Sequence, residues 1–196
     1  MIQKRFDIIV IGSGPAGESA AVTAAKTGKK VAMICDKPRL GGNCAFLGTI
    51  PSKALRHIVK QFMQFNTNPM FMDLADVRSL TFPTIMKHAN RVVEEQANQR
   101  TDVYQRNGIP VIHGTAAFID KNNIEVVNGK VVTRLYSDNF IIATGSRPYH
   151  PETVDFNHQL VFDSDTILKL DRTPRKVTII GAGVIGCEYA SIFGGL

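Results

Sequence analysis

Two glycine-rich runs have the spacing that receives the diphosphate of a dinucleotide in nucleotide-binding proteins. They are Gly12-Ser13-Gly14-Pro15-Ala16-Gly17 and Gly181-Ala182-Gly183-Val184-Ile185-Gly186. In such a run, the first glycine permits a tight turn, the second lets a diphosphate approach the backbone, and the third lets a helix pack closely on a strand. The free N–H groups at the start of that helix then attract the phosphates. Two runs predict two nucleotide-binding units, although a tight turn without a ligand has the same pattern.

The residues around the first run predict the elements that would position it. Asp7 to Ile11 is a short β-branched strand, an alanine-rich helix extends to about Thr27, and Val31 to Ile34 is a second strand. Such a unit has a right-handed crossover. Its second strand should end in an acidic residue that binds the ribose hydroxyls, and Asp36 is the candidate. A surface aspartate at the end of a strand is the alternative.

The rest of the chain alternates between helix and strand patterns. Long helices are expected at about 51–65 and 82–107, with an irregular segment at 66–80 between them. Strands are expected at 111–112, 115–119, 124–127, 130–135, 140–143 and 176–180, and Asn128-Gly129 predicts a hairpin with a type I′ turn. A helix follows the second glycine run. Since a nucleotide-binding unit that stops in its first helix is incomplete, we expect an N-terminal piece of a longer protein.

The composition argues against several classes of protein. With 44% apolar and 20% charged residues and no long apolar run, we expect a soluble, folded protein of the cytoplasm that binds no membrane. The net charge of +6 comes from dispersed lysines and arginines, so nucleic-acid binding is not expected. Three cysteines far apart in the sequence indicate a reducing compartment. The five histidines have no metal-ligand spacing, and we expect no metal site.

Two further motifs, taken with the glycine runs, resemble one family. Gly41 to Lys53 and Ile141 to Pro148 resemble the flavin motifs of the FAD-dependent pyridine nucleotide–disulfide oxidoreductases. With the glycine runs in matching places, the resemblance extends from Asp7 to Phe193. It implies an α/β fold in which 1–150 is a Rossmann-like FAD-binding domain with a helical insertion and a β-hairpin element. The segment 151–196 would be a connector and the beginning of a second Rossmann domain, which binds NAD(P).

One departure from the family changes the expected chemistry. The family's signature has two cysteines that form a redox disulfide beside the flavin, whereas this chain has Cys44 and, at the partner position, Thr49. A lone thiol opposite a hydroxyl cannot cycle between dithiol and disulfide. Together with the run Gly48 to His57, this departure resembles those members that transfer a hydride from NADPH to NAD⁺ through FAD. This implies an enzyme with FAD as cofactor and NADP and NAD as substrates, and a homo-oligomer when full length.

The resemblance also implies roles for particular residues. Lys53 would lie near the reactive nitrogen of the flavin and, with Cys44, is a candidate catalytic residue. Glu188 would face the nicotinamide region. Cys35 takes the position of the family's acidic ribose ligand, with Asp36 one place later. The candidate cofactor-binding residues are Gly12, Gly14, Pro15, Ala16, Gly17, Asp36, Lys37, Gly41, Gly42, Asn43, Cys44, Thr49, Lys53, Gly114, Ala116, Thr144, Gly145, Ser146, Arg147, Gly181, Gly183, Gly186 and Glu188.

Two other functions stay open at the level of the sequence. One is a disulfide-reductase relative, similar to dihydrolipoamide dehydrogenase, that uses Cys44 alone as a mixed disulfide or a sulfenic acid. The other is a non-catalytic FAD-binding module, because the second nucleotide site is incomplete within these residues. The non-functional alternative for Lys53 is an ordinary surface lysine, and that for Glu188 is a solvated residue of a helix.

Overall fold

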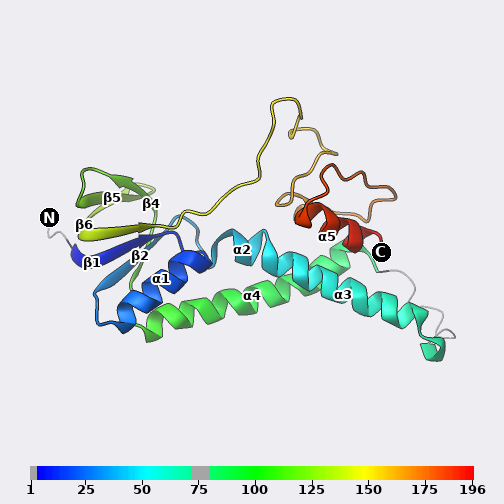
Figure 1. The fold of residues 1–196 in the computed structure, drawn as a ribbon, viewed down its shortest axis with the longest axis horizontal. Coiled ribbons are helices and arrows are strands. Elements are labelled where there is room, and N and C mark those ends of the chain that lie inside the picture. Colours follow the sequence, from blue (N-terminus) through cyan, green and yellow to red (C-terminus); the bar gives the residue numbers. More distant parts are fainter. Residues whose placement is uncertain (1–3, 72–79) are drawn as a thin grey trace. The chain divides into compact units, whose positions relative to one another are not determined.

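The computed structural model describes residues 4–71 and 80–196, and its internal contacts divide the chain into two units (Figure 1). Unit 1 comprises Met1–Ala45 and Glu95–Ser146, and unit 2 comprises Phe46–Glu94 and Arg147–Leu196. Each unit is therefore assembled from two separate stretches of sequence. The domain division expected at residue 150 stays a prediction.

Unit 1 is built on a mixed six-stranded sheet. Its strand order is β3-β2-β1-β6-β5-β4. The parallel neighbours are β3, β2, β1 and β6, whereas β6, β5 and β4 are antiparallel. The strands are β1 (Lys4–Ile11), β2 (Val31–Cys35), β3 (Val111–His113), β4 (Thr115–Phe118), β5 (Asn123–Asn128) and β6 (Val131–Ile142). Together with the helices, this sheet confirms the predicted α/β fold.

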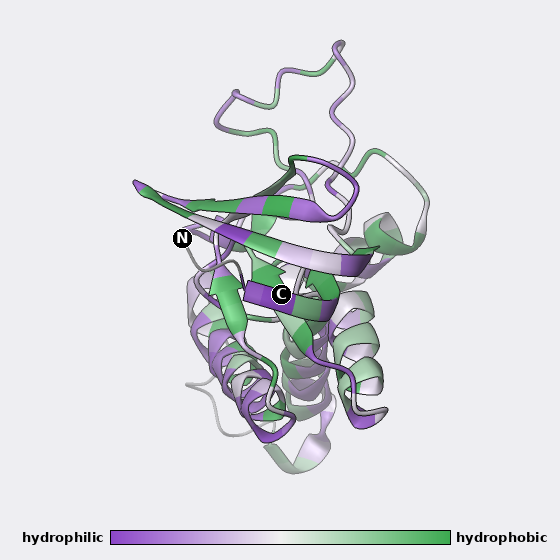
Figure 2. Cartoon of the chain, turned by 90° about the vertical axis from the view of Figure 1, so that its left-hand side faces the viewer, coloured by the Kyte–Doolittle hydropathy of each residue, from purple (hydrophilic) through white to green (hydrophobic). Residues whose placement is uncertain are grey.

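Alternate side chains of a strand point to opposite faces of the sheet, and in β1 and β2 both sets of side chains are covered. On one face, β1 and β2 pack against α1 (Pro15–Lys26) and the second half of α4 (Phe82–Arg106). On the other face, they pack against apolar side chains of the β5–β6 hairpin. As a result β2 is buried along its whole length. Figure 2 shows hydrophobic colour in these strands and hydrophilic stretches on the helices.

β6 is longer than the sequence indicates. The strands expected at 130–135 and 140–143 are one strand, because β5 pairs with its first half up to Tyr136 and β1 pairs with it from Leu135 onward. The predicted hairpin is confirmed, since Asn128 pairs with Val131. Its turn is not of type I′, which needs positive φ at both central residues. Only Gly129 has a positive φ, at 58°, which is the type II′ pattern and spares Lys130 a strained backbone.

Unit 2 is helical. Its main elements are α3 (Thr49–Thr67), the first half of α4 and α5 (Val184–Phe193), with the short turns η1 (Pro69–Phe71) and η3 (Ile167–Lys169). One apolar core joins them, with fully buried side chains from α3, α4 and α5. In Figure 1, α5 lies beside α3. The two long helices predicted from the sequence are confirmed, and α2 (Gly42–Phe46) is an additional short helix.

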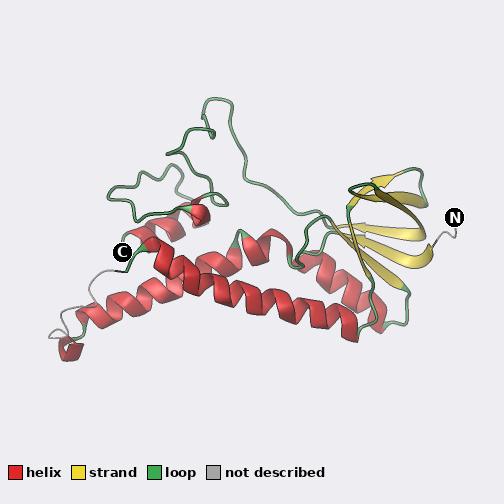
Figure 3. Cartoon of the chain, turned by 180° about the vertical axis from the view of Figure 1, so that it is seen from behind, coloured by secondary structure: helices red, strands yellow, loops and turns green. Residues whose placement is uncertain are grey.

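The segment before α5 differs from the prediction. Residues 176–180 are not a strand, and Figure 3 shows the chain between β6 and α5 without any strand among the described residues. Val177 is 42% exposed and Ile180 is 94% exposed. An apolar β-branched segment forms a strand only when another strand satisfies its backbone groups, and the described residues supply none here. Most of the irregular segment expected at 66–80 falls on residues 72–79, outside the described residues.

Among the helices in 4–71 and 80–196, none combines the length and the apolar character needed to cross a membrane.

Candidate functional site

The first glycine loop joins the end of β1 to the start of α1. Gly12 has a φ of 109°, and a Cβ there would overlap the carbonyl oxygen of Ala143. A Cβ on Gly17 would overlap the carbonyl oxygen of Gly12, so the helix packs against the loop as the sequence predicts. Around Gly14 no atom lies within 4 Å of an added Cβ. Backbone atoms therefore leave no room for a side chain at Gly12 and Gly17, whereas the space beside Gly14 is empty.

The second glycine loop resembles the first in its backbone angles and at its third glycine, but no atom lies within 4 Å of a Cβ added to its first glycine. Gly181 has a φ of 118°, and a Cβ on Gly186 would overlap the carbonyl oxygen of Gly181. Gly183 caps α5 with φ −76° and ψ 179°, whereas Gly14 caps α1 with φ −68° and ψ 177°. Neither helix has a side-chain cap on its first N–H groups. Both loops thus present uncapped N–H groups, the arrangement that binds phosphate at a helix start.

Within unit 1 the flavin motifs lie next to the first glycine loop. A Cβ added to Gly42 would lie 2.9 Å from the Cα of Gly14, so the two backbones are in close approach. The side-chain amide of Asn43 donates a hydrogen bond of 2.9 Å to the carbonyl oxygen of Ser146. That bond ties the Gly41–Asn43 turn to the Thr144–Ser146 segment, which continues from β6. The structure therefore brings together motifs that are about a hundred residues apart in the sequence.

The end of β2 differs from the family pattern in a way the structure explains. Cys35 is 4% exposed, and its thiol lies 3.0 Å from the hydroxyl of Ser13, inside the first glycine loop. Asp36 is exposed, and its carboxylate lies 3.3 Å from the ammonium group of Lys37. Cys35 therefore faces the loop and not the solvent, and Asp36 is the acidic group left at the strand end. Its role as ribose ligand stays a prediction.

The neighbouring strand ends fix the loop after β2. The imidazole Nδ1 of His113 lies 3.0 Å from the carbonyl oxygen of Lys37, and the N–H of Gly114 donates to the carbonyl oxygen of Cys35 at 2.9 Å. Ala116 follows in β4, paired with Val126. Of the predicted cofactor-binding residues, Gly114 thus lies against the end of β2 and Ala116 lies in β4.

In unit 2, Lys53 and Glu188 form an ion pair. The ammonium group of Lys53 lies 2.6 Å from Oε1 of Glu188, and the hydroxyl of Ser52 donates to Oε2 at 3.0 Å. Glu188 is only 17% exposed, whereas Lys53 is 61% exposed. The carboxylate therefore fixes the ammonium end of a lysine side chain that is otherwise mostly exposed. The sequence selected both residues but did not indicate their contact. It did not single out Ser52, although Ser52 lies within the Gly41–Lys53 motif.

Three further predicted residues lie in or near the helices that follow the first glycine loop and in the segment after β6. Cys44 is half-buried in α2, Thr49 is the first residue of α3, and Arg147 is the first residue of the second stretch of unit 2. All three cysteines are free thiols in the structure. The catalytic role of Cys44 and the cofactor contacts of Thr49 and Arg147 stay predictions.

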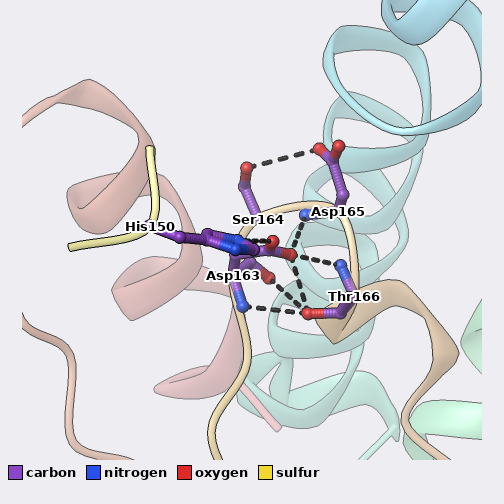
Figure 4. A network of polar contacts seen from close by, with 5 residues as sticks. All are labelled: His150, Asp163, Ser164, Asp165 and Thr166. Carbon is purple, nitrogen blue, oxygen red and sulfur yellow. Dashed lines mark hydrogen bonds and ion pairs between the residues drawn. The ribbon is translucent and has the colours of Figure 1, made fainter. Parts of the chain in front are cut away.

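A polar network that the sequence does not indicate connects two loops of unit 2 (Figure 4). The Nε2 atom of His150 lies 2.7 Å from Oδ2 of Asp163, and the His150 ring stacks on Phe156. The carboxylate of Asp163 also accepts hydrogen bonds from the N–H of Asp165 and from the N–H and hydroxyl of Thr166. Partial burial raises the pKa of Asp163, but the bonds from Thr166, His150 and Asp165 outweigh it and lower the pKa to about 2. The charged carboxylate organises this turn.

The first glycine loop fits the diphosphate of FAD on structural grounds. Open space at Gly14, an uncapped helix start and the adjoining Gly42 backbone together form a place where an anion can meet backbone N–H groups. The residues that would hold the cofactor are those of the glycine loop, the Gly41–Asn43 turn and the Thr144–Ser146 segment.

Comparisons with known proteins agree with this geometry. The family model described as pyridine nucleotide-disulphide oxidoreductase matches residues 6–196. The soluble pyridine nucleotide transhydrogenase of Hahella chejuensis is 57% identical over 100% of this chain and 42% of its own length. That of Pseudomonas putida strain GB-1 is 58% identical over 97% of this chain and 41% of its own length. This chain thus spans about two-fifths of the length of these relatives.

A solved structure has the same fold. The Cu(II) complex of the HOCl-induced flavoprotein disulfide reductase RclA from Escherichia coli is 30% identical, with a TM-score of 0.81. The match covers 100% of this chain and 41% of that chain. The similarity extends over both units and confirms the predicted FAD-binding, Rossmann-like fold class.

Proposed function

The chain belongs to the pyridine nucleotide-disulphide oxidoreductase family, and on that premise we propose that it is the flavin-binding part of a transhydrogenase. The whole protein would transfer a hydride from NADPH to NAD⁺ through FAD, without a redox disulfide. The observation that carries this proposal is the single cysteine of the flavin motif, Cys44, opposite Thr49. The names of the relatives at 57% and 58% identity support it.

The residues of this chain would bind and orient the reactants. Backbone N–H groups at the start of α1 would hold the diphosphate of FAD, and Asp36 would contact its ribose. The second glycine loop, Gly181 to Gly186, has matching backbone angles at the start of its helix and would hold the diphosphate of a nicotinamide nucleotide. Bound FAD would supply the group that accepts and releases the hydride.

Lys53 and Glu188 would act on the cofactor through charge. Glu188 fixes the lysine at 2.6 Å, which limits the rotamers of a long side chain that is otherwise exposed. A fixed ammonium group near the flavin would stabilise negative charge on the reduced ring. Ser52 would hold the carboxylate from its other oxygen.

The test uses the full FAD-loaded protein with NADPH and the NAD⁺ analogue thio-NAD⁺, whose reduced form has a distinct absorption band. We expect turnover without any added disulfide or thiol substrate. Cys44→Ser should retain most of the rate, because no electron passes through that thiol. The matched control is Cys187→Ser, which alters an exposed thiol outside the flavin motif.

The second candidate is a single-cysteine disulfide reductase, favoured by the likeness to a structure described as a flavoprotein disulfide reductase. The same variant separates the two candidates. A loss of roughly a thousandfold in rate on Cys44→Ser, about 4 kcal/mol of activation free energy, would favour a thiol mechanism. Absence of turnover in a protein that binds FAD would favour a non-catalytic flavin-binding module.

A further inference from the structure

We propose that Arg100 is a positioning residue for the diphosphate of FAD, because it neutralises Glu18 and supports the Gly41–Gly42 turn behind the first glycine loop. The inference rests on the FAD binding proposed above. It assigns a role to two residues that lie outside all four motifs of the sequence analysis.

The first observation is a shielded ion pair within unit 1. Nε of Arg100, from the second half of α4, lies 2.9 Å from Oε2 of Glu18, from the first turn of α1. The two side chains are 15% and 26% exposed. Arg100 also donates from Nη1 to the carbonyl oxygen of Gln96 at 3.4 Å. Because unpaired charges are costly when they are shielded from water, each of these residues needs the other.

The second observation is the packing of Arg100 against the flavin motif. A Cβ added to Gly41 would lie 3.1 Å from Cδ of Arg100, so the arginine stem occupies the side of the turn where a side chain would otherwise be. The N–H of Gly41 donates to the hydroxyl of Ser13 at 3.3 Å. The adjoining Gly42 lies against the backbone of Gly14. Arg100 therefore supports a turn that touches the phosphate loop directly.

The third step is electrostatic. Glu18 directly follows Gly17 and lies in the helical turn whose N–H groups would receive the diphosphate. An uncompensated carboxylate there would repel the phosphates. This repulsion would be stronger than in open water, because the surroundings are partly shielded from solvent. Arg100 removes this repulsion and leaves the N–H groups free.

Tyr104 lies one turn after Arg100 on α4 and faces the same carboxylate. Its side chain is 1% exposed, and its hydroxyl has no hydrogen-bond partner among the described residues. Burial, and to a smaller extent the charge of Glu18, raise the pKa of this hydroxyl, so it stays neutral. Compensation of Glu18 therefore comes from Arg100.

The experiment measures the dissociation constant of FAD for the apoprotein of the full protein, by flavin absorbance titration. Arg100→Met should weaken FAD binding at least about tenfold. Glu18→Gln should bind FAD as tightly as the wild type, and the double variant should regain most of the loss, because the repelling carboxylate is gone. Arg106→Met is the matched control, since it removes an arginine of α4 that is 77% exposed, and it should change nothing.

The outcomes separate the two proposals. Failure of the wild-type protein to bind FAD would overturn the proposed function itself. Wild-type affinity in Arg100→Met would overturn only the role of Arg100. A double variant as weak as Arg100→Met would overturn the neutralisation of Glu18, because packing alone would then account for the loss. If Arg100→Met does not fold, Arg100→Lys keeps the charge and should bind FAD within about threefold of the wild type. A tenfold loss in a folded Arg100→Lys protein would then overturn the inference.

Discussion

The three glycines of the first loop serve different purposes, and the space around each one distinguishes them. Gly12 and Gly17 face backbone atoms that a side chain would overlap. Gly14 faces open space and has an ordinary φ of −68°, so the fold itself tolerates a side chain there. The fold by itself therefore does not require a glycine at that position, which agrees with the proposed approach of a diphosphate.

Gly14→Val should abolish FAD binding and leave the protein folded. We expect the free energy of unfolding of the apoprotein to fall by no more than about 1 kcal/mol, from the weaker helix cap. FAD should no longer co-purify. The measurements are flavin content and urea denaturation. Gly17→Val is the contrasting variant, because its side chain collides with the Gly12 carbonyl oxygen and should lower the stability by about 3 kcal/mol or more. Full flavin occupancy in Gly14→Val would contradict the assignment of this loop.

At the scale of elements, the carboxylate of one side chain, Asp163, stabilises a turn in unit 2. Between β6 and α5 there is little regular structure apart from η3, and the Asp163 carboxylate organises the turn that leads into it. His150 joins this turn to the loop that follows β6 (Figure 4). Hydrogen bonds to one charged group thus replace the ladder bonds that a strand would supply.

Asp163→Asn should destabilise the protein in a pH-dependent way. The pKa of Asp163 is about 2 in the folded protein, below its ordinary value of 3.8, so the stabilisation is complete above pH 3.8 and is lost as the pH falls through 2. We expect the variant to be less stable by about 1 kcal/mol near neutral pH, with the difference shrinking on acidification. Urea denaturation at a series of pH values measures it. Asp171→Asn alters a carboxylate that is 82% exposed and serves as the control. A difference that does not change with pH would contradict this explanation.

At the scale of the whole molecule, apolar side chains are gathered on one exposed stretch. Ile180 is 94% exposed, Val184 is 84% exposed and Ile185 is 58% exposed. Ile180 directly precedes the second glycine loop, and Val184 and Ile185 lie within it. Exposed apolar surface of this kind favours association between molecules.

The 196-residue chain in isolation should therefore associate as its concentration rises. Sedimentation velocity measures the distribution of species. Replacing Ile180 and Val184 together by lysine should shift the distribution towards monomer, because charge replaces exposed apolar area. Tyr149→Lys alters a side chain that is 85% exposed but lies outside this stretch, and it should have little effect. A monodisperse monomer at high concentration in the unaltered chain would refute the prediction.

The sequence alone determined the features that depend on local pattern. The two glycine runs, the first βαβ unit, the long helices and the β-hairpin follow from residue spacing and from periodicity, because neighbouring residues set them. The flavin motifs could also be recognised in the sequence, since Gly41 to Lys53 and Ile141 to Pro148 are continuous stretches.

Only the tertiary structure decided the features that depend on a partner distant in sequence. β6 is one strand because β1 and β5 both pair with it, whereas 176–180 is no strand because no described strand pairs with it. Cys35 contacts Ser13 because the fold places the first glycine loop beside the end of β2. The pairs Lys53–Glu188 and Arg100–Glu18 join residues far apart in sequence, and neither spacing nor periodicity carries a signal for such contacts. Packing brings these charges together, and in the Arg100–Glu18 pair, which is shielded from water, each charge compensates the other.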